Sequence, residues 1–246
     1  MTLRLFLFLE ILLLFIILII VFKTTQKQQL ELFSNYDVYF KENLHKTYQY
    51  SKKTKNTIFV SVASYRDTEC MKTIVDLFEK AENPNNIYVG ICQQNKNSNE
   101  NCIPDNFKYN DNIRIKKYDY KDALGPTFAR YICSHLWDGE EFYLQIDSHS
   151  RCIPKWDKKL LDMYKQCPSE KAILTHRPPT HQLYDKVVND TLSPTYTCSA
   201  HFENNFHIIA DSRHVTNKFT KQPFRSPYVS AGLLFGKSEF LHDVPF

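Results

Sequence analysis

The sequence predicts an α/β domain in which helices flank a mostly parallel central sheet. Short apolar runs rich in β-branched residues alternate with stretches of helical period, which is typical of parallel α/β layers. Several of these runs are continuous, as expected of strands covered on both faces. Two of them end in charged side chains, and ligands bind beyond the carboxyl ends of strands in such folds. The sequence therefore predicts both a sheet and the edge of it that carries a site.

Each element has its own signal. Predicted strands lie at 58–62, 87–94, 112–119, 141–146 and 171–177, with a later strand and turn within 228–241. The first helix, in 69–81, is expected to bury the stripe Met71, Ile74, Val75 and Phe78. The second, in 123–137, begins near Pro126 and is expected to bury Ala129, Ile132, Cys133 and Leu136. A third helix is expected in 155–167.

An apolar run from Leu5 to Phe22 precedes this domain, and only Glu10 interrupts it. A helix of that length rises ~27 Å, enough to cross a hydrocarbon core. A cleaved signal peptide is the alternative, but its apolar region is about 7–15 residues long and ends in small residues, unlike this run. We therefore expect a transmembrane signal anchor at 1–22, a stem at 23–56 and the domain at 57–246. We expect a type II protein of the Golgi or endoplasmic reticulum with a lumenal domain, although the flanking basic residues do not decide the orientation.

Composition excludes several classes of protein. A formal charge of +4 and a pI near 8.5 are too weakly basic to indicate a nucleic-acid partner. The five glycines form neither the dinucleotide-binding fingerprint nor a P-loop. The seven cysteines show no zinc-site spacing. Cys92 and Cys102 bracket a polar loop and are the expected disulfide, whereas Cys133 is expected in the core.

The strand at 141–146 is followed by Asp147, Ser148 and His149. If the chain stays extended past Ile146, Asp147 and His149 project to the same side, because side chains alternate along a strand. A carboxylate and an imidazole together suit Mn²⁺, or else Mg²⁺, with water or substrate oxygens as the other ligands. The alternatives are a strand-end turn or helix cap for Asp147 and a hydrogen-bonded, half-buried ring for His149.

Other polar residues are expected at the same edge of the sheet. Arg130 lies early in its helix and off the apolar stripe, so it is either an anion-binding group or a surface salt-bridge residue. Ser64, Arg66 and Asp67 follow the first strand. Arg66 and Asp67 either bond a base or ribose, or Asp67 caps the next helix.

Four segments resemble a known family, in order and in spacing: "IFVSVASYRDTEC", "GPTFAR", "YLQIDSHSRCIPKWD" and "YVSAGLLFGKSEFLHDVPF". From about residue 57 onward the chain is similar to the GlcNAc-transferases that include the hydroxyproline-directed and mucin-type polypeptide N-acetylglucosaminyltransferases. The resemblance implies a GT-A fold, a UDP-GlcNAc donor, a divalent metal, a protein or peptide acceptor and retention of anomeric configuration. An N-terminal membrane anchor occurs in some members.

The resemblance also implies roles for particular residues. Asp147 and His149 match the D-x-H metal motif, Arg66 and Asp67 fall where the first strand meets uridine, and Arg130 falls near the donor diphosphate. The segment that lines the donor sugar or the acceptor contains Ala231, Gly232 and Gly236, where small residues allow close approach; a tight turn is the alternative. The family continues past "HDVPF" through an acidic segment and a late histidine that can join the metal, so we expect those elements to lie outside this sequence.

The resulting expectation is a metal-dependent transferase that moves GlcNAc to a Ser, Thr or hydroxyproline hydroxyl, with no catalytic base assigned. Two alternatives stay open. One is a membrane-tethered protein, derived from such an enzyme by truncation, that binds a nucleotide sugar or carbohydrate without catalysis. The other is a metal-dependent hydrolase, which needs more ligands at one point than the dispersed histidines offer.

Overall fold

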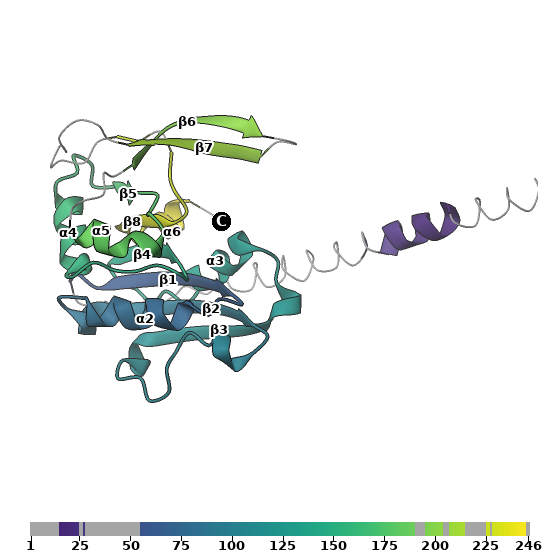
Figure 1. Ribbon diagram of the computed structural model, residues 1–246, viewed down its shortest axis with the longest axis horizontal. Coiled ribbons are helices and arrows are strands. Elements are labelled where there is room, and N and C mark those ends of the chain that lie inside the picture. The colour runs from purple at the N-terminus through teal and green to yellow at the C-terminus, as the bar shows by residue number, and fades with distance from the viewer. Residues whose placement is uncertain are drawn as a thin grey trace, which may run out of the picture. The chain divides into compact units, whose positions relative to one another are not determined.

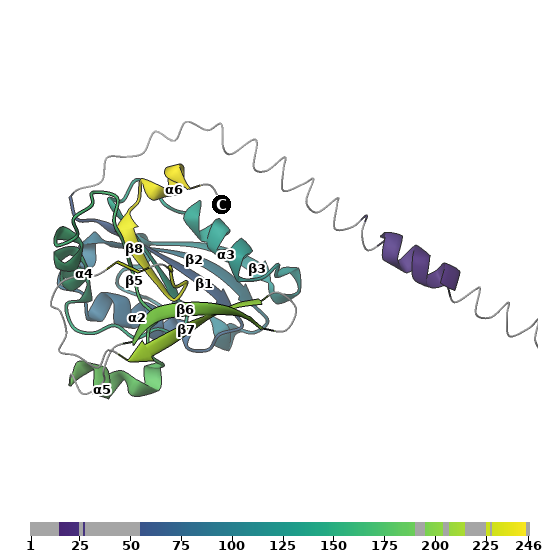
Figure 2. The same ribbon diagram turned by 90° about the horizontal axis from the view of Figure 1, so that it is seen from above.

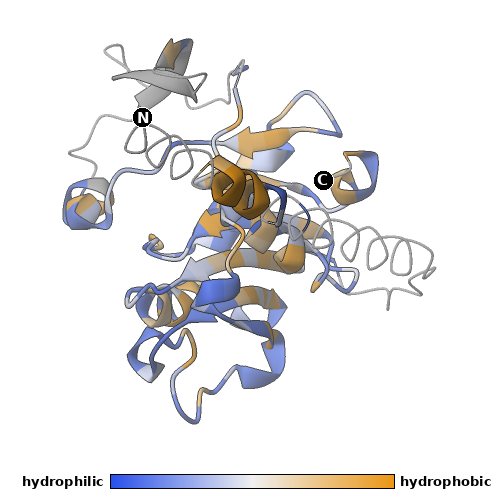
Figure 3. Ribbon diagram, turned by 90° about the vertical axis from the view of Figure 1, so that its right-hand side faces the viewer, coloured by the Kyte–Doolittle hydropathy of each residue, from blue (hydrophilic) through white to orange (hydrophobic). Residues whose placement is uncertain are grey.

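The computed structural model describes residues 15–24, 27, 55–189, 195–203, 207–214, 225–226 and 228–244. Residues 15–24 form a helix whose large apolar side chains are exposed, and Figure 3 shows it mostly in the orange of hydrophobic residues. Within the described residues, no helix has both the length and the apolar character needed to cross a bilayer. Most of the expected anchor and stem lies outside these residues, so both stay predictions. The chain forms two compact units, Met1–Tyr50 and Ser51–Phe246.

The second unit contains the predicted elements in the predicted order (Figure 1). Its strands are β1 (Ile58–Tyr65), β2 (Ile87–Asn95), β3 (Ile113–Asp119), β4 (Phe142–Asp147), β5 (Ile173–Thr175), β6 (Thr195–Glu203), β7 (His207–His214) and β8 (Leu233–Lys237). Its α-helices are α2 (Cys70–Glu79), α3 (Pro126–Ser134), α4 (Trp156–Lys165), α5 (Tyr184–Val188) and α6 (Phe240–Asp243).

The main sheet has the strand order β3-β2-β1-β4-β8-β5. Strands β3, β2, β1 and β4 pair in parallel, and β8 runs antiparallel to both β4 and β5. The predicted mostly parallel α/β sheet is therefore confirmed. Because β8 runs in reverse, its first residue, Leu233, pairs with Ile146 near the carboxyl end of β4. The residues before β8 therefore reach the edge at which the parallel strands end.

Helices cover both faces of the sheet. Ile74 of α2 and Trp156 of α4 pack in one apolar cluster with Val60 and Val62 of β1. Helix α3 contacts β1 and β2 and buries Ala129, Ile132 and Cys133. Figures 1 and 2 show α2 and α3 on opposite sides of β1. The buried stripe of α2 is one position away from the expected one: Cys70, Thr73, Ile74, Leu77 and Phe78 are buried, whereas Met71 and Val75 are only partly so.

The expected disulfide between Cys92 and Cys102 is wrong. Cys102 is bonded to Cys70, at the start of α2, and Cys92 is a free, buried thiol. The reason is the alternation of β2: Ile91 belongs to the cluster under α2, so its neighbour Cys92 faces the other side of the sheet. Burial there raises the pKa of the Cys92 thiol to about 12. Cys133 lies in the core, as expected.

Candidate functional site

The carboxyl ends of β1 and β4 lie side by side. Ala63 of β1 is in register with Asp147 of β4, so the loops that follow both strands leave the sheet at one place. We call this place the carboxyl edge and define it by residues 63–67 and 147–151. It is the position that the α/β fold predicts for a ligand site.

The chain does not stay extended after Ile146, as the alternation argument assumed. β4 ends at Asp147, and a turn follows in which the Ser150 N–H donates to the Asp147 carbonyl at 3.3 Å. Asp147 and His149 consequently have different partners, described below. The strand period therefore does not account for the position of His149.

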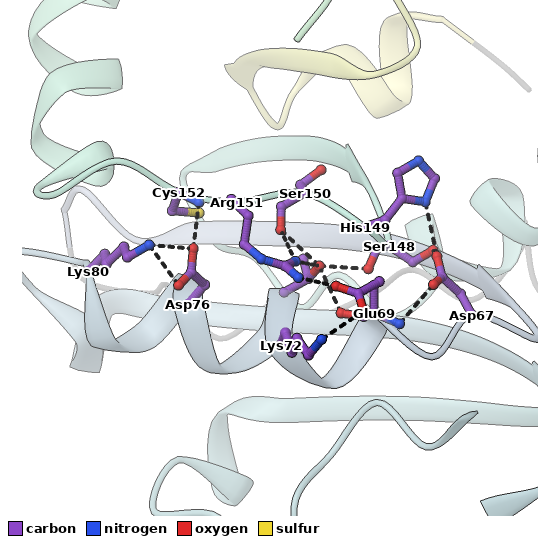
Figure 4. A network of polar contacts seen from close by, with 11 residues as sticks. Asp67, Glu69, Lys72, Asp76, Lys80, Ser148, His149, Ser150, Arg151 and Cys152 are labelled. Atoms are coloured by element: carbon purple, nitrogen blue, oxygen red, sulfur yellow. Dashed lines mark hydrogen bonds and ion pairs between the residues drawn. The ribbon is translucent and has the colours of Figure 1, made fainter. Parts of the chain in front are cut away.

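Asp67 is the hydrogen-bond partner of two residues of the Asp-Ser-His segment, Ser148 and His149. The Ser148 hydroxyl donates to Asp67 Oδ2 at 2.5 Å, and His149 Nδ1 lies 3.0 Å from the same oxygen. Figure 4 shows both side chains reaching Asp67 from the loop after β4. The Glu69 N–H donates to Asp67 Oδ1 at 2.9 Å. Because Glu69 is the N-cap of α2 and the helix has no side-chain cap hydrogen bond, this contact forms a turn before the helix, and the capping role considered for Asp67 is not what the structure shows. Burial acts to raise the pKa of Asp67, but hydrogen bonds from Ser148, His149 and a backbone N–H outweigh it and lower that pKa.

Residues at the start of helix α2 hold the loop of Ser148–Arg151 in place. The Thr73 hydroxyl lies 2.6 Å from the carbonyl of Ser148 and 3.0 Å from that of Ser150. The Arg151 guanidinium forms an ion pair with Glu69 and donates to the Ser150 carbonyl at 2.8 Å. These contacts, drawn in Figure 4, fix the backbone from which His149 projects.

Asp147 pairs with the basic side chain of α3. Arg130 Nη2 donates to Asp147 Oδ1 at 2.9 Å and lies 3.4 Å from the carbonyl of Ala231. Arg130 Nε is shielded from solvent and has no hydrogen-bond partner among the described residues. Gly232 lies against the carboxylate, because a Cβ there would be 3.3 Å from Asp147 Oδ2. Arg130, Ala231 and Gly232 thus meet Asp147 at the carboxyl edge.

The remaining candidates have other surroundings. Arg66 adopts a left-handed backbone with φ of 51°, and its side chain lies 3.6 Å from Glu100 and over the Tyr120 ring. Ser64 is fully buried, and its hydroxyl has no partner among the described residues. Gly236 pairs with Tyr143 inside the sheet, three residues along β8 from the edge, where a Cβ would approach the Ala172 carbonyl to 2.9 Å. Its position fits sheet packing rather than a substrate contact.

The predicted metal ligands each keep a ligand atom without a hydrogen-bond partner in the described part of the chain, Nε2 of His149 and Oδ2 of Asp147. Their side chains are 60% and 40% exposed, and a hydrogen bond from the other ring nitrogen of His149 to a carboxylate is what metal-binding histidines usually make. The described residues contain no group of three or more His, Cys, Asp or Glu side chains that could hold a metal. A cation on Asp147 and His149 would take its other ligands from water or substrate.

Sequence reasoning missed the contacts that organise this site. The sequence predicts no role for Ser148, yet its hydroxyl donates to Asp67, which lies 81 residues earlier in the chain. The only signal for this contact is that both strands end beside each other, and no local spacing reveals it.

Comparisons with known proteins place this geometry in context. No curated protein matches the chain. Similar solved structures include the mannosyltransferase PcManGT of Pyrobaculum calidifontis with GDP-Man and Mn²⁺, with 11% identity, a TM-score of 0.46, and coverage of 85% of this chain and 52% of that one. Another is Staphylococcus aureus TarS 1-349 with UDP-GlcNAc, with 17% identity, a TM-score of 0.39, and coverage of 76% and 47%. The chain thus spans about half the length of these proteins.

A family model described as "Glycosyltransferase (GlcNAc)" matches residues 57–111 and 104–246. These matches cover most of the chain and include every residue of the carboxyl edge. The chain therefore belongs to the GlcNAc glycosyltransferase family.

Proposed function

We propose that this chain transfers N-acetylglucosamine from UDP-GlcNAc to a Ser, Thr or hydroxyproline hydroxyl of a protein, with retention of configuration and with Mn²⁺ or Mg²⁺. Membership of the family supports the class of reaction. The observation that carries the proposal is the carboxyl edge, where Asp147 and His149 each keep one ligand atom without a partner among the described residues and where Arg130 pairs with Asp147. We further propose a GT-A-like domain at 57–246 behind a signal anchor at 1–22 and a stem at 23–56, in the lumen of the Golgi or endoplasmic reticulum.

The side chains have separable tasks in this proposal. A divalent cation, when bound, neutralises the charge of a departing diphosphate. Asp147 and His149 would hold it, and Arg130 would donate to phosphate oxygens with the nitrogens that Asp147 does not use. Gly232 lets Pro178 and the Asp147 carboxylate lie close to its backbone, which fixes the position of that carboxylate. No residue is assigned as a base, and none is needed if a leaving-group phosphate oxygen accepts the proton.

Calorimetric titration of the chain with UDP-GlcNAc, with and without Mn²⁺, tests the proposal. We expect binding that depends on Mn²⁺ and that weakens about 100-fold in Asp147→Ala, because the variant loses a metal ligand. Asp111→Ala is the matched control, since Asp111 is an exposed carboxylate that precedes β3 at the opposite end of the strands.

Two results would overturn parts of the proposal. Binding that ignores both Mn²⁺ and the Asp147 substitution contradicts a metal-assisted donor site. Metal-dependent binding without GlcNAc transfer to Ser, Thr or hydroxyproline peptides favours the alternative of a non-catalytic nucleotide-sugar-binding protein. The second result leaves the donor site in place and removes only the catalytic claim.

A further inference from the structure

We propose that Asp67 is a positioning residue that fixes the ring of His149 for the metal, rather than a residue that contacts the nucleoside. This inference rests on the proposed function. It starts from the 3.0 Å contact between His149 Nδ1 and Asp67 Oδ2, which joins the loops after β1 and β4 across 82 residues of sequence.

Proton accounting gives the direction of this hydrogen bond. An ionised carboxylate can only accept, so the proton between the two groups belongs to Nδ1 of His149. A neutral imidazole protonated on Nδ1 keeps its lone pair on Nε2. The Asp67 contact therefore selects the tautomer in which the exposed nitrogen is the one that can bind a metal.

The oxygens of Asp67 are already engaged. Oδ2 receives Ser148 and His149, and Oδ1 receives the Glu69 N–H. The side chain of Asp67 is 18% exposed, whereas that of His149 is 60% exposed. Of this pair, the imidazole is the group that a ligand can reach, and the carboxylate acts through it.

The surrounding loop makes the arrangement specific. Ser148 is buried, and its carbonyl is held by Thr73 of α2 at 2.6 Å. The backbone on either side of His149 is thus held by α2, the helix that begins shortly after Asp67. A ring held at both its backbone and its Nδ1 has little freedom left to turn its exposed Nε2. Pre-orientation of this kind is worth about 10–100-fold in metal affinity.

Asp67→Asn in the full chain tests the inference through three measurements. The first is Mn²⁺ affinity by calorimetry without nucleotide, expected to fall about 10–100-fold. The second is the ¹⁵N spectrum of the His149 ring in metal-free protein, expected to lose the pattern of a ring protonated only on Nδ1. The third is the affinity for uridine without metal, expected to stay unchanged because the nucleoside alone needs no cation.

Two variants serve as controls. Asp119→Asn changes an exposed cap that accepts the Lys121 N–H, and it is expected to leave all three measurements unaltered. In His149→Ala the Mn²⁺ affinity is already reduced, and adding Asp67→Asn is expected to reduce it no further, because Asp67 acts through the imidazole.

The inference is overturned if Asp67→Asn leaves the ring spectrum and the Mn²⁺ affinity unchanged. It is equally overturned if uridine binding without metal falls by a similar factor, since Asp67 would then touch the nucleoside. Failure of the proposed function gives a different pattern: UDP-GlcNAc does not bind the unmodified chain, while the ring spectrum still reports whether Asp67 selects the tautomer.

Discussion

Both edges of the main sheet carry charged residues, but they use them differently. At the amino edge, where β4 begins, Glu140 is fully buried between Arg114 and the Asp138 N–H, and Glu141 is held by Lys237 and the Asn56 N–H. At the carboxyl edge, the side chains of Asp147 and His149 each have one partner among the described residues and are 40% and 60% exposed.

The contrast separates charges that stabilise from charges that can bind. A buried ion pair whose hydrogen-bonding capacity is filled has nothing left for a ligand, and removal of one partner leaves an uncompensated buried charge. A half-exposed group that is held on one side and open on the other can exchange water for a substrate oxygen or a cation. Charge alone therefore does not distinguish the candidate site in this sheet. The distinguishing property is that its charged groups can still bind a ligand.

The largest expected effect is at the amino edge. Glu140→Gln leaves Arg114 without its buried counter-charge and is expected to lower the free energy of unfolding by about 3 kcal/mol, measured by urea denaturation. This value is at the low end for a broken buried pair because the Arg114 side chain is 25% exposed. Affinity for UDP-GlcNAc is expected to be unaltered.

A double substitution sharpens this result. Arg114→Met combined with Glu140→Gln removes both charges, and Met can pack against the Phe59 and Tyr88 rings that Arg114 now covers. We expect the double variant to recover part of the lost stability. A double variant less stable than the two single losses added together would contradict a simple ion-pair role.

The next effect is at the carboxyl edge. Arg130→Ala removes the charge-assisted donor, worth about 1.5–3 kcal/mol, so UDP-GlcNAc affinity in Mn²⁺ is expected to fall about 10–100-fold by calorimetry. Mn²⁺ affinity without nucleotide is expected to rise, because Asp147 no longer shares its carboxylate. Arg130→Lys keeps the charge without the planar fork and should lie between. A parallel fall of both affinities would show that Arg130 merely supports the local fold.

A smaller effect separates two glycines. Gly232→Ala places a methyl group 3.0 Å from Pro178 Cδ and 3.3 Å from Asp147 Oδ2, so these neighbours must shift by a few tenths of an ångström. We expect donor affinity to fall by about tenfold or less, since the ligand geometry changes only slightly. Gly236→Ala, inside the sheet, is expected to change thermal stability and not donor affinity. If Gly236→Ala lowers donor affinity and leaves thermal stability unchanged, Gly236 belongs to the substrate-binding residues after all.

The smallest effect concerns acid stability at the amino edge. Burial acts to raise the pKa of Glu141, but Lys237 and the Asn56 N–H lower it below its ordinary value of 4.5. The stabilisation is therefore fully present above pH 4.5 and is lost as the pH falls through the lowered value. We expect the free energy of unfolding, measured in urea between pH 3 and 6, to depend less on pH in Glu141→Gln. The difference is at most about 1 kcal/mol, because the Glu141 side chain is 30% exposed. Curves of equal slope would contradict this.

Much of the fold was predictable because it depends on local period. Continuous apolar runs and stripes of helical spacing identified the strands and helices of the main sheet, including the start of α3 at Pro126. The hairpin of β6 and β7 was not predicted, since its sequence mixes threonine, histidine and acidic residues without a clear alternation. The predicted disulfide was wrong because the face of β2 on which a cysteine lies decides which other thiol it can reach. The direction of β8 likewise depends on strand pairing, which the period of the sequence does not encode.

The candidate site divides in the same way. Asp147, His149 and Arg130 could be proposed from strand ends and a helix start, because topology brings such positions to one edge. The partnership of Asp67 with His149 joins two loops that only the parallel pairing of β1 with β4 places together. The side-chain direction of Arg66, toward Glu100 and Tyr120, likewise depends on contacts far away in sequence.

The reversed direction of β8 has one more consequence. The chain leaves the sheet at Thr175 and returns to it at Leu233. The Thr175 hydroxyl joins the two points, because it lies 2.7 Å from the Ser230 nitrogen and 3.0 Å from the Leu233 carbonyl oxygen. The segment between these residues includes α5, β6 and β7, and its two ends meet at this hydroxyl, next to the Gly232 that lies against Asp147. Because surface connections tolerate changes in length and sequence better than a sheet does, this segment could vary while the carboxyl edge keeps its geometry, and under the proposed function such variation would alter the acceptor and not the donor.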